Sequence, residues 1–438
     1  MNLITRSTSL LAALIAAMLA TGVAMAAASD GSAAIRPVGH TVKSIDVRGS
    51  AQGEQRQVAV HLWYPARRSD ASASPRTVYR SALHGVLLPE PWDPLSWSVE
   101  ARSAREGAAI DPAGKRFPVI VFSHGSVNDP IDYAHTLELI AAAGFVVAAP
   151  YHVNNTQDDV RIDYINTRAG SQLIPCNDGR PGPCSRTAVP FSMADRVRDI
   201  SSVLDRLPAW LAHRVDVSRA GVLGHSRGTV TALAAAGGSA DWGAPPGLNC
   251  VPAQPNGEHP RHCWPGLVRE PRVKAIMGMA IGGPPITFGA DLSNVRVPTL
   301  LVAGTRDMTS PPEVSEAAFE QIATRRKAFI PIKNATHRSF DSTYCDQTQA
   351  AGAIAQAKTD AILDLHTFTG IVNAPTSGKA IDYCPFATFT NPTDIRGLVA
   401  SLTGFAVTQD NVPTTGLDTE RVKHKMTALA VIFFGTAL

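Results

Sequence analysis

Between residues 117 and 332, short apolar runs alternate with longer segments that have the spacing of amphipathic helices. The short runs are rich in Val, Ile and Ala and predict strands in FPVIVFSHG, FVVAAP, RAGVLGHS, RVKAIMGMAI, VPTLLVAG and KAFIPI. Helices are predicted between them, in DYAHTLELIAAAG, SMADRVRDISSVLDRLPAWL, TVTALAAAGG and PEVSEAAFEQIAT. Apolar strands bounded by helices indicate βαβ units and a parallel sheet covered on both faces. The alternation therefore predicts a mostly parallel, doubly wound α/β fold.

Two more strands, TVKSIDVRG and QRQVAVHLWYPA, are predicted ahead of this alternation, separated by the turn-forming SAQGEQ. Three irregular segments interrupt the pattern, at residues 67–115, 151–190 and 239–271. They are long for connecting loops, so we interpret them as inserts at the edge of the sheet where a cleft forms. Residues 27–438 are expected to form one α/β domain that carries these inserts.

The N-terminus has the pattern of an export signal. Arg6 precedes LLAALIAAMLATGVAMA, an apolar stretch that ends in Ala24-Met25-Ala26, the small-x-small pattern that signal peptidases recognise. Its unbroken apolar core is too short for a stable membrane-spanning helix, and an N-terminal membrane anchor is the alternative. We expect residues 1–26 to be removed and the mature chain to be secreted or periplasmic.

The six cysteines are interpreted in the light of that export. In an oxidising compartment an even number of cysteines indicates disulfides. Nearness in the sequence favours three pairs: Cys176–Cys184, Cys250–Cys263 and Cys345–Cys384. The segment HPRHC places His259 and His262 close to Cys263, but this spacing matches no standard zinc pattern. We therefore expect disulfides that pin the inserts, and no metal.

Charge and hydropathy argue against two classes of partner. The net charge is +3, and no run of Lys and Arg indicates a nucleic-acid surface. The C-terminal stretch VKHKMTALAVIFFGTAL is apolar and amphipathic but short for a membrane span. We expect it to be a helix packed on the sheet, with peripheral membrane binding as the alternative. Another helix is predicted in CDQTQAAGAIAQAKTDAILDLH.

One strand and the helix after it meet in Gly224-His225-Ser226-Arg227-Gly228, which fits the motif G-x-S-x-G. The turn in this motif is so tight that both flanking positions need glycine, and it presents the serine hydroxyl at the carboxyl end of the sheet. The N-terminus of the next helix points to the same place and favours negative charge there. We interpret Ser226 as a nucleophile rather than as an ordinary serine in a glycine-rich turn.

A serine hydroxyl needs a base that accepts its proton and an acid that orients the base. His337 follows the predicted strand KAFIPI and is the candidate base, and Asp307 follows VPTLLVAG and is the candidate acid. The order serine, acid, histidine is the one in which this motif is used. Asp291 is the rival acid, but the end of the strand before it has no carboxylate at the turn.

Two backbone N–H groups are expected to stabilise an oxyanion beside the nucleophile. One belongs to Arg227, the residue after the nucleophile. The other belongs to Ser126, in the loop after FPVIVF, where Gly125 allows the chain to approach closely.

These segments resemble the α/β-hydrolase family, and more narrowly the predicted dienelactone hydrolases that are grouped with platelet-activating factor acetylhydrolases. The resemblance spans residues 41–346 and rests on VHLWYPA, FPVIVFSHGS, GFVVAAPYH, AGVLGHSRG, RVKAIMGMA, VPTLLVAGTRD and THRSF. It implies a secreted serine hydrolase of carboxylic esters, an esterase or lipase with a small-molecule, lipid or polymer substrate and with no metal or cofactor.

The sequence departs from these relatives at two positions. Ser226 stands where dienelactone hydrolases have a cysteine nucleophile, and Thr229 stands where acetylhydrolase relatives usually have a second glycine. The acid of those relatives also tends to come earlier in the chain. Three alternatives are left open: an exported peptidase or amidase with the same triad, a polyester or phospholipid-acyl hydrolase, and a non-catalytic binding protein on a hydrolase scaffold.

Overall fold

The computed structural model describes the parts of the chain that carry the sheet and its helices, and the elements below all belong to the unit Pro37–Leu438. The described residues are 36–48, 55–80, 98–113, 116–125, 128–153, 156, 193–238, 248–251, 262–265, 269–282, 292–305, 307, 310–333, 335, 337–340 and 416–438.

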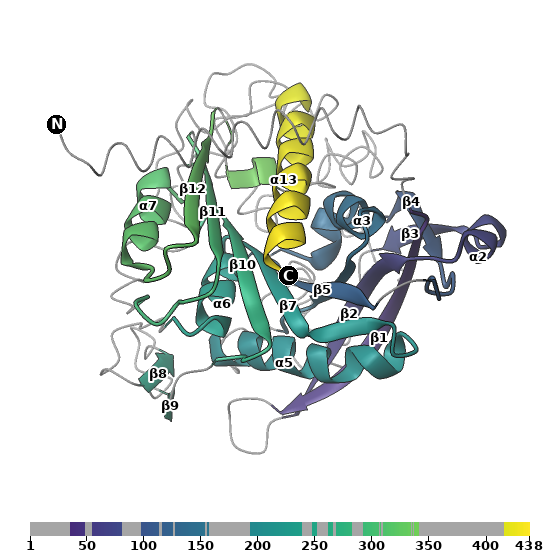
Figure 1. Cartoon of the computed structure of the whole chain (residues 1–438), viewed down its shortest axis with the longest axis horizontal. Coiled ribbons are helices and arrows are strands. Elements are labelled where there is room, and N and C mark those ends of the chain that lie inside the picture. Colours follow the sequence, from purple (N-terminus) through teal and green to yellow (C-terminus); the bar gives the residue numbers. More distant parts are fainter. Residues whose placement is uncertain are drawn as a thin grey trace, which may run out of the picture. The chain divides into compact units, whose positions relative to one another are not determined.

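A ten-stranded mixed sheet organises the fold, with the strand order β12-β11-β10-β7-β5-β6-β2-β1-β4-β3 (Figure 1). The strands from β12 to β6 in this order run parallel to one another, whereas β2 is antiparallel to both of its neighbours, β6 and β1. The strands are β1 Val38–Arg48, β2 Gln55–Pro65, β3 Arg76–Arg80, β4 Ser98–Glu106, β5 Phe117–Ser123, β6 Val146–Pro150, β7 Val215–His225, β10 Val273–Met279, β11 Thr299–Gly304 and β12 Lys327–Ile332.

Helices cover both faces of this sheet, as the two residues Gly221 and Val222 of β7 demonstrate. Adjacent residues of a strand point to opposite faces. Val222 belongs to a core cluster shared with α5 (Met193–Trp210), α6 (Arg227–Ala235) and α7 (Pro312–Gln321). A Cβ on Gly221 would instead contact the ring of Phe434 in α13 (Gly416–Ala437). Figure 1 shows α13 in front of the parallel strands, beside α3 (Ala134–Ala142), with which it is in contact.

The prediction of a mostly parallel α/β sheet is confirmed, and the fold is that of the α/β-hydrolases. Every strand predicted from an apolar run is present, and the central ones are apolar because they are buried on both faces. In β6 all residues from Val146 to Pro150 are buried. The predicted helices are present as well within the described residues, and the apolar face of α5 is buried as its spacing predicts: Val197, Ile200, Val203, Leu204 and Leu207.

The prediction that residues 67–115 form an irregular insert is wrong. This segment contains the helix α2 (Arg68–Ala73) and the strands β3 and β4, which extend the sheet beyond β1. The sequence of β4, SVEARSARE, has no apolar run because its buried positions are occupied by Ala101 and Ala104. Strands near a sheet edge need only short buried side chains on one face, so their hydropathy pattern is weak.

The predicted insert at 239–271 contains a separate two-stranded sheet, in which β8 (Leu248–Val251) is antiparallel to β9 (His262–Pro265). Cys250 lies directly opposite Cys263 in this pairing. Directly opposite residues have Cα atoms about 4.5–5.5 Å apart, which is within the span of a disulfide. The disulfide itself stays a prediction, and Cys176, Cys184, Cys345 and Cys384 lie outside the described residues, as do most of the predicted insert at 151–190 and the helix predicted around residue 356.

The C-terminal helix α13 packs on the sheet, as predicted. Phe434 is fully buried against β7, and Arg219 of β7 donates a hydrogen bond to the carbonyl of Leu438 at 2.6 Å. Among the described residues, no helix is long and apolar enough to span a bilayer. The same residues contain no cluster of three or more His, Cys, Asp or Glu side chains that fits a metal ion.

Candidate active site

Ser226 lies on a strained turn between β7 and α6. Its backbone has φ 53° and ψ −119°, a combination that residues with a side chain rarely adopt. Its N–H donates to the carbonyl of Met279 at the end of β10, at 2.9 Å. The turn therefore holds the serine at the carboxyl ends of the central parallel strands, where this class of sheet places its ligands.

The two glycines of the motif are required by close packing. A Cβ on Gly224 would collide with the backbone of Gly228, and a Cβ on Gly228 would collide with the carbonyl of Ser123 at the end of β5. The turn is therefore tight, and it packs directly against the end of β5. This agrees with the steric reason for which the sequence pattern predicted a serine turn here.

Thr229 replaces the second glycine of the relatives and stabilises the same turn by hydrogen bonds. Its hydroxyl is placed to donate to the carbonyl oxygens of Gly224, at 3.0 Å, and Met279, at 2.8 Å. Its methyl group fills the space beside Gly278, where any side chain would collide with it. The departure at position 229 therefore leaves the geometry of the turn intact.

Asp307 and His337, the predicted acid and base, are in contact. His337 Nδ1 lies 2.8 Å from Asp307 Oδ2, and both side chains are buried. The other carboxylate oxygen accepts the backbone N–H of Ser310 at 2.7 Å. A carboxylate accepts from Nδ1–H, so in the neutral imidazole the lone pair lies on Nε2, which is the tautomer a general base needs. Asp291 lies outside the described residues.

His225, the residue before the serine, connects the turn to the loop of His337. Its Nε2–H donates to the carbonyl of His337 at 3.1 Å, and the two rings lie 4.7 Å apart between centroids. A ring that donates from Nε2 accepts at Nδ1, so the hydroxyl of Tyr133 donates to Nδ1, at 2.6 Å. The serine turn and the histidine loop are therefore joined by a buried side chain that sequence reasoning did not single out.

Gly282 leaves open the space beside the nucleophile. A Cβ at this position would collide with Ser226 Oγ and would lie 2.7 Å from the backbone nitrogen of Arg227. An ester carbonyl that reacts with Ser226 needs the space between that hydroxyl and that N–H. Sequence reasoning considered the end of this strand only for its lack of a carboxylate and overlooked this steric role.

Of the two predicted oxyanion donors, the structure describes Arg227 but not Ser126. Arg227 begins α6, so its N–H is one of the first in the helix, and burial lowers the pKa of its side chain to about 10. Ser126 lies outside the described residues. The chain before it passes the nucleophile closely, since a Cβ on Gly125 would lie 3.3 Å from the Cβ of Ser226.

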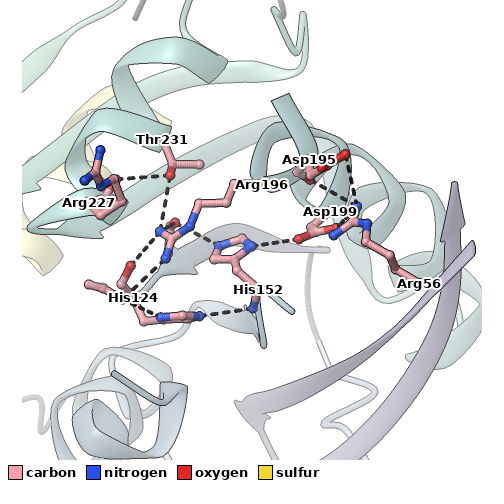
Figure 2. A network of polar contacts seen from close by, with 10 residues as sticks. Arg56, His124, His152, Asp195, Arg196, Asp199, Arg227 and Thr231 are labelled. Carbon is pink, nitrogen blue, oxygen red and sulfur yellow. Dashed lines mark hydrogen bonds and ion pairs between the residues drawn. The ribbon is translucent and has the colours of Figure 1, made fainter. Parts of the chain in front are cut away.

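A hydrogen-bonded Ser-His-Asp chain lies next to the serine turn and is completely buried. Ser123 Oγ is 2.9 Å from His152 Nε2, and His152 Nδ1 is 2.8 Å from Asp199 Oδ2. Figure 2 shows His152 between Asp199 and the guanidinium of Arg196, with Arg56 on the far side of Asp199. Arg56 binds Asp199 at 2.8 Å. Sequence reasoning missed this network, whose only local signal is a histidine two residues after the strand FVVAAP.

The buried histidines of this network are neutral. Burial, and next the positive charge of Arg196, lower the pKa of both His124 and His152 well below 6.5. Burial raises the pKa of Asp199, although Arg56 opposes this shift. Neutral tautomers satisfy every hydrogen bond of the two rings: His124 donates from Nδ1 to the carbonyl of Gly125 and accepts the N–H of His152.

Comparison with known proteins adds a family resemblance over part of the chain. The model of the family "Platelet-activating factor acetylhydrolase, isoform II" matches residues 46–161. This range includes β2, β5 and the loop with Gly125, and it ends before Ser226. The chain resembles this family, and the match supports a carboxylic ester hydrolase. No curated protein matches the chain.

Solved structures of esterases are similar to the chain at low identity. One is a ferulic acid esterase from Streptomyces cinnamoneus, with 20% identity and a TM-score of 0.44, covering 77% of this chain and 88% of that one. Another is a cold-adapted esterase from an Arctic intertidal metagenomic library, with 13% identity and a TM-score of 0.34, covering 69% of this chain and 86% of that one. The functional argument below therefore rests on the site.

Proposed function

We propose that this chain is an exported serine esterase that hydrolyses carboxylic esters by two-step acyl transfer. The observation that carries the proposal is the pair formed by His337 and Asp307, whose loop is tied through His225 to the strained turn of Ser226. A strained serine, an oriented neutral imidazole and an N–H at a helix N-terminus are the parts that acyl transfer requires.

In the first step His337 Nε2 takes the proton of Ser226 Oγ as this oxygen attacks the ester carbonyl carbon. Asp307 accepts the hydrogen bond from Nδ1–H and stabilises the imidazolium that forms. The N–H groups of Arg227 and Ser126 stabilise the oxyanion. As the C–O bond of the ester breaks, His337 protonates the departing alcohol. Water then attacks the acyl group by the same route and releases the acid.

Export and the disulfides are part of this proposal. They are supported by the sequence pattern around Arg6 and Ala24-Met25-Ala26 and by the even number of cysteines. The position of Cys250 opposite Cys263 fits the same interpretation.

The proposal is tested with p-nitrophenyl esters of increasing acyl length and a fluorophosphonate probe. The wild-type protein is expected to hydrolyse the esters and to be labelled at Ser226. Ser226→Ala is expected to lower kcat by about 10⁴-fold or more and to abolish labelling without a loss of folded structure.

Ser218→Ala is the matched control, because Ser218 is an exposed serine near the other end of the same strand. This variant is expected to behave like the wild type in both assays. Undiminished hydrolysis by Ser226→Ala, or cleavage of peptide amides with no reaction on esters, would contradict the proposal.

A further inference from the structure

We propose that Arg196 is a positioning residue that holds together the two chain segments from which the oxyanion donors come. One segment is the turn after β5, at His124 and Gly125, and the other is the first turn of α6, which begins at Arg227. This inference rests on the proposed function and goes beyond it, because Arg196 contacts neither the nucleophile nor the base in any of its hydrogen bonds described below.

The guanidinium of Arg196 projects from α5 into the space between these segments (Figure 2). Nη1 donates to the carbonyl of His124 at 2.7 Å, and Nη2 donates to the carbonyl of Gly125 at 3.3 Å. Nη1 also lies 3.4 Å from the hydroxyl of Thr231 in α6. That hydroxyl in turn donates to the carbonyl of Arg227 at 3.2 Å. One planar side chain thus contacts both segments.

The hydrogen bonds to Gly125 fix the direction of the amide that follows it. The peptide group is planar and its C=O and N–H point in opposite directions. The carbonyl of Gly125 accepts from Arg196 and from Nδ1 of His124, at 2.7 Å, so its direction is set from two sides. Any rotation of this peptide group would break both bonds.

The cost of burying Arg196 indicates that its place is specific. Its side chain is 1% exposed, and a buried cation is expensive unless hydrogen bonds and opposite charges compensate it. One path of compensation runs through hydrogen bonds: Arg196 donates to Ser123 Oγ at 3.3 Å, Ser123 donates to His152, and His152 donates to Asp199. The buried Ser-His-Asp chain therefore orients the guanidinium rather than a substrate.

Holding both carbonyls requires the planar guanidinium of an arginine. The carbonyls of two consecutive residues are reached by two different nitrogens of the same guanidinium, a geometry that the single nitrogen of lysine does not provide. Arg196→Lys keeps the positive charge and loses the two-nitrogen guanidinium. Arg196→Met keeps much of the length of the side chain but loses both the charge and the guanidinium.

The test compares both variants with the wild type in kcat, KM and the inhibition constant of a trifluoromethyl ketone, which forms a tetrahedral adduct with the serine. Misplaced oxyanion donors weaken the binding of the transition state and of its analogue, but they do not weaken the binding of the substrate in its ground state. Arg196→Met is expected to lower kcat about 10²-fold and to raise the inhibition constant of the ketone by a similar factor. Its KM is expected to stay within about twofold of the wild-type value. Arg196→Lys is expected to lie between this variant and the wild type.

Arg272→Met is the matched control. Arg272 also bonds to α5, at the carbonyl of Ser201 and the carboxylate of Asp205, and it is paired with Glu270. Its loss is expected to destabilise the fold while kcat stays within about twofold of the wild type. Circular dichroism and the urea midpoint of each variant separate loss of structure from loss of positioning.

The outcomes are distinct. A folded Arg196→Met with kcat near the wild-type value, or one in which KM and kcat change alike while ketone binding is unaltered, overturns the inference. If Arg196→Met does not fold, Arg196→Lys decides by the same criteria, and a lysine variant with full kcat and ketone affinity overturns it. A wild-type protein that neither hydrolyses esters nor reacts with the fluorophosphonate probe overturns the proposed function and this inference with it.

Discussion

The molecule contains two histidine–aspartate pairs with nearly identical contacts, one hydrogen-bonded to Ser123 and the other assigned to Ser226 by the proposed function. In both, a histidine Nδ1 lies 2.8 Å from an aspartate Oδ2, in one case His337 and Asp307, in the other His152 and Asp199. They differ at the serine. Ser226 is on a strained turn at the N-terminus of a helix, whereas Ser123 ends a regular strand and is fully buried.

This difference shows that a serine near a histidine–aspartate pair is not by that alone a nucleophile. Ser123 accepts a hydrogen bond from Arg196 and donates its own to His152, so both its proton and its lone pair are committed. Burial and the positive charges of Arg196 and Arg56 keep His152 neutral by lowering its pKa. A base that cannot hold a proton, next to a hydroxyl that no substrate reaches, is a structural element.

The sharpest way to test this contrast is to replace each aspartate by asparagine. Asp307→Asn is expected to lower kcat by about 10³- to 10⁴-fold with little change in stability, because asparagine presents the wrong hydrogen bond to Nδ1 of His337. Asp199→Asn is expected to lower the free energy of unfolding by about 3 kcal/mol, because the buried Arg56 loses its closest carboxylate. Its loss of kcat per folded molecule should stay below about tenfold.

Ester hydrolysis and urea unfolding measured on both variants decide the comparison. If Asp199→Asn lost activity as severely as Asp307→Asn while staying folded, the buried chain would take part in the chemistry. If Asp307→Asn instead lost stability and kept its kcat, the roles given to the two chains would be reversed.

A smaller effect is expected from the space beside Ser226 that an ester carbonyl needs. Gly282→Ala puts a methyl group against Ser226 Oγ and the N–H of Arg227, so kcat/KM should fall about 10²-fold and labelling by a fluorophosphonate should slow in proportion. Gly435→Ala is the control, because a Cβ there meets no atom within 4 Å. Rapid labelling of a folded Gly282→Ala would show that this space is not where the carbonyl reacts.

The last comparison concerns the pH dependence of stability. Burial lowers the pKa of His61, His124 and His152, so these side chains stay neutral in the folded protein where the unfolded chain takes up protons. Because the unfolded state then binds more protons, the free energy of unfolding falls as the pH drops below about 6.5, by up to about 1.4 kcal/mol per histidine per pH unit. The raised pKa of Asp199 acts in the opposite direction and offsets part of this loss.

Urea midpoints at pH 7.5, 6 and 5 measure this dependence. Carboxylates with a lowered pKa, such as Glu270 at about 2, contribute stability that is lost only below about pH 4.5, so they do not contribute to a change between pH 6.5 and 5. Equal midpoints at pH 7.5 and pH 5 would contradict neutral burial of these histidines.

Most of the parallel sheet could be predicted because its physical signal is local. A strand covered on both faces is apolar throughout, and the serine turn between β7 and α6 needs glycines at fixed spacing, so both are visible in a few consecutive residues. The contact of Asp307 with His337 could be predicted in the same way, since each follows its own strand and parallel strands end at the same edge.

Other features had no local signal. The strands β3 and β4 were missed because β4 uses alanines at its buried positions. Gly282 was not recognised because its importance comes from Ser226, which lies 56 positions earlier in the chain.

The sequence by itself determined the order of the elements, the strained serine and the candidates for its acid and base, because spacing along the chain sets backbone conformation at short range. Only the tertiary structure decided that Ser123 is fully buried and hydrogen-bonded to His152, whereas Ser226 lies on a strained turn with open space beside it. The contacts of Ser123, His152 and Asp199 depend on the order of the strands in the sheet and on the packing of α5 against it. Burial and neighbouring charge, which assign the two sets of side chains their different roles, arise from that packing and not from residue type.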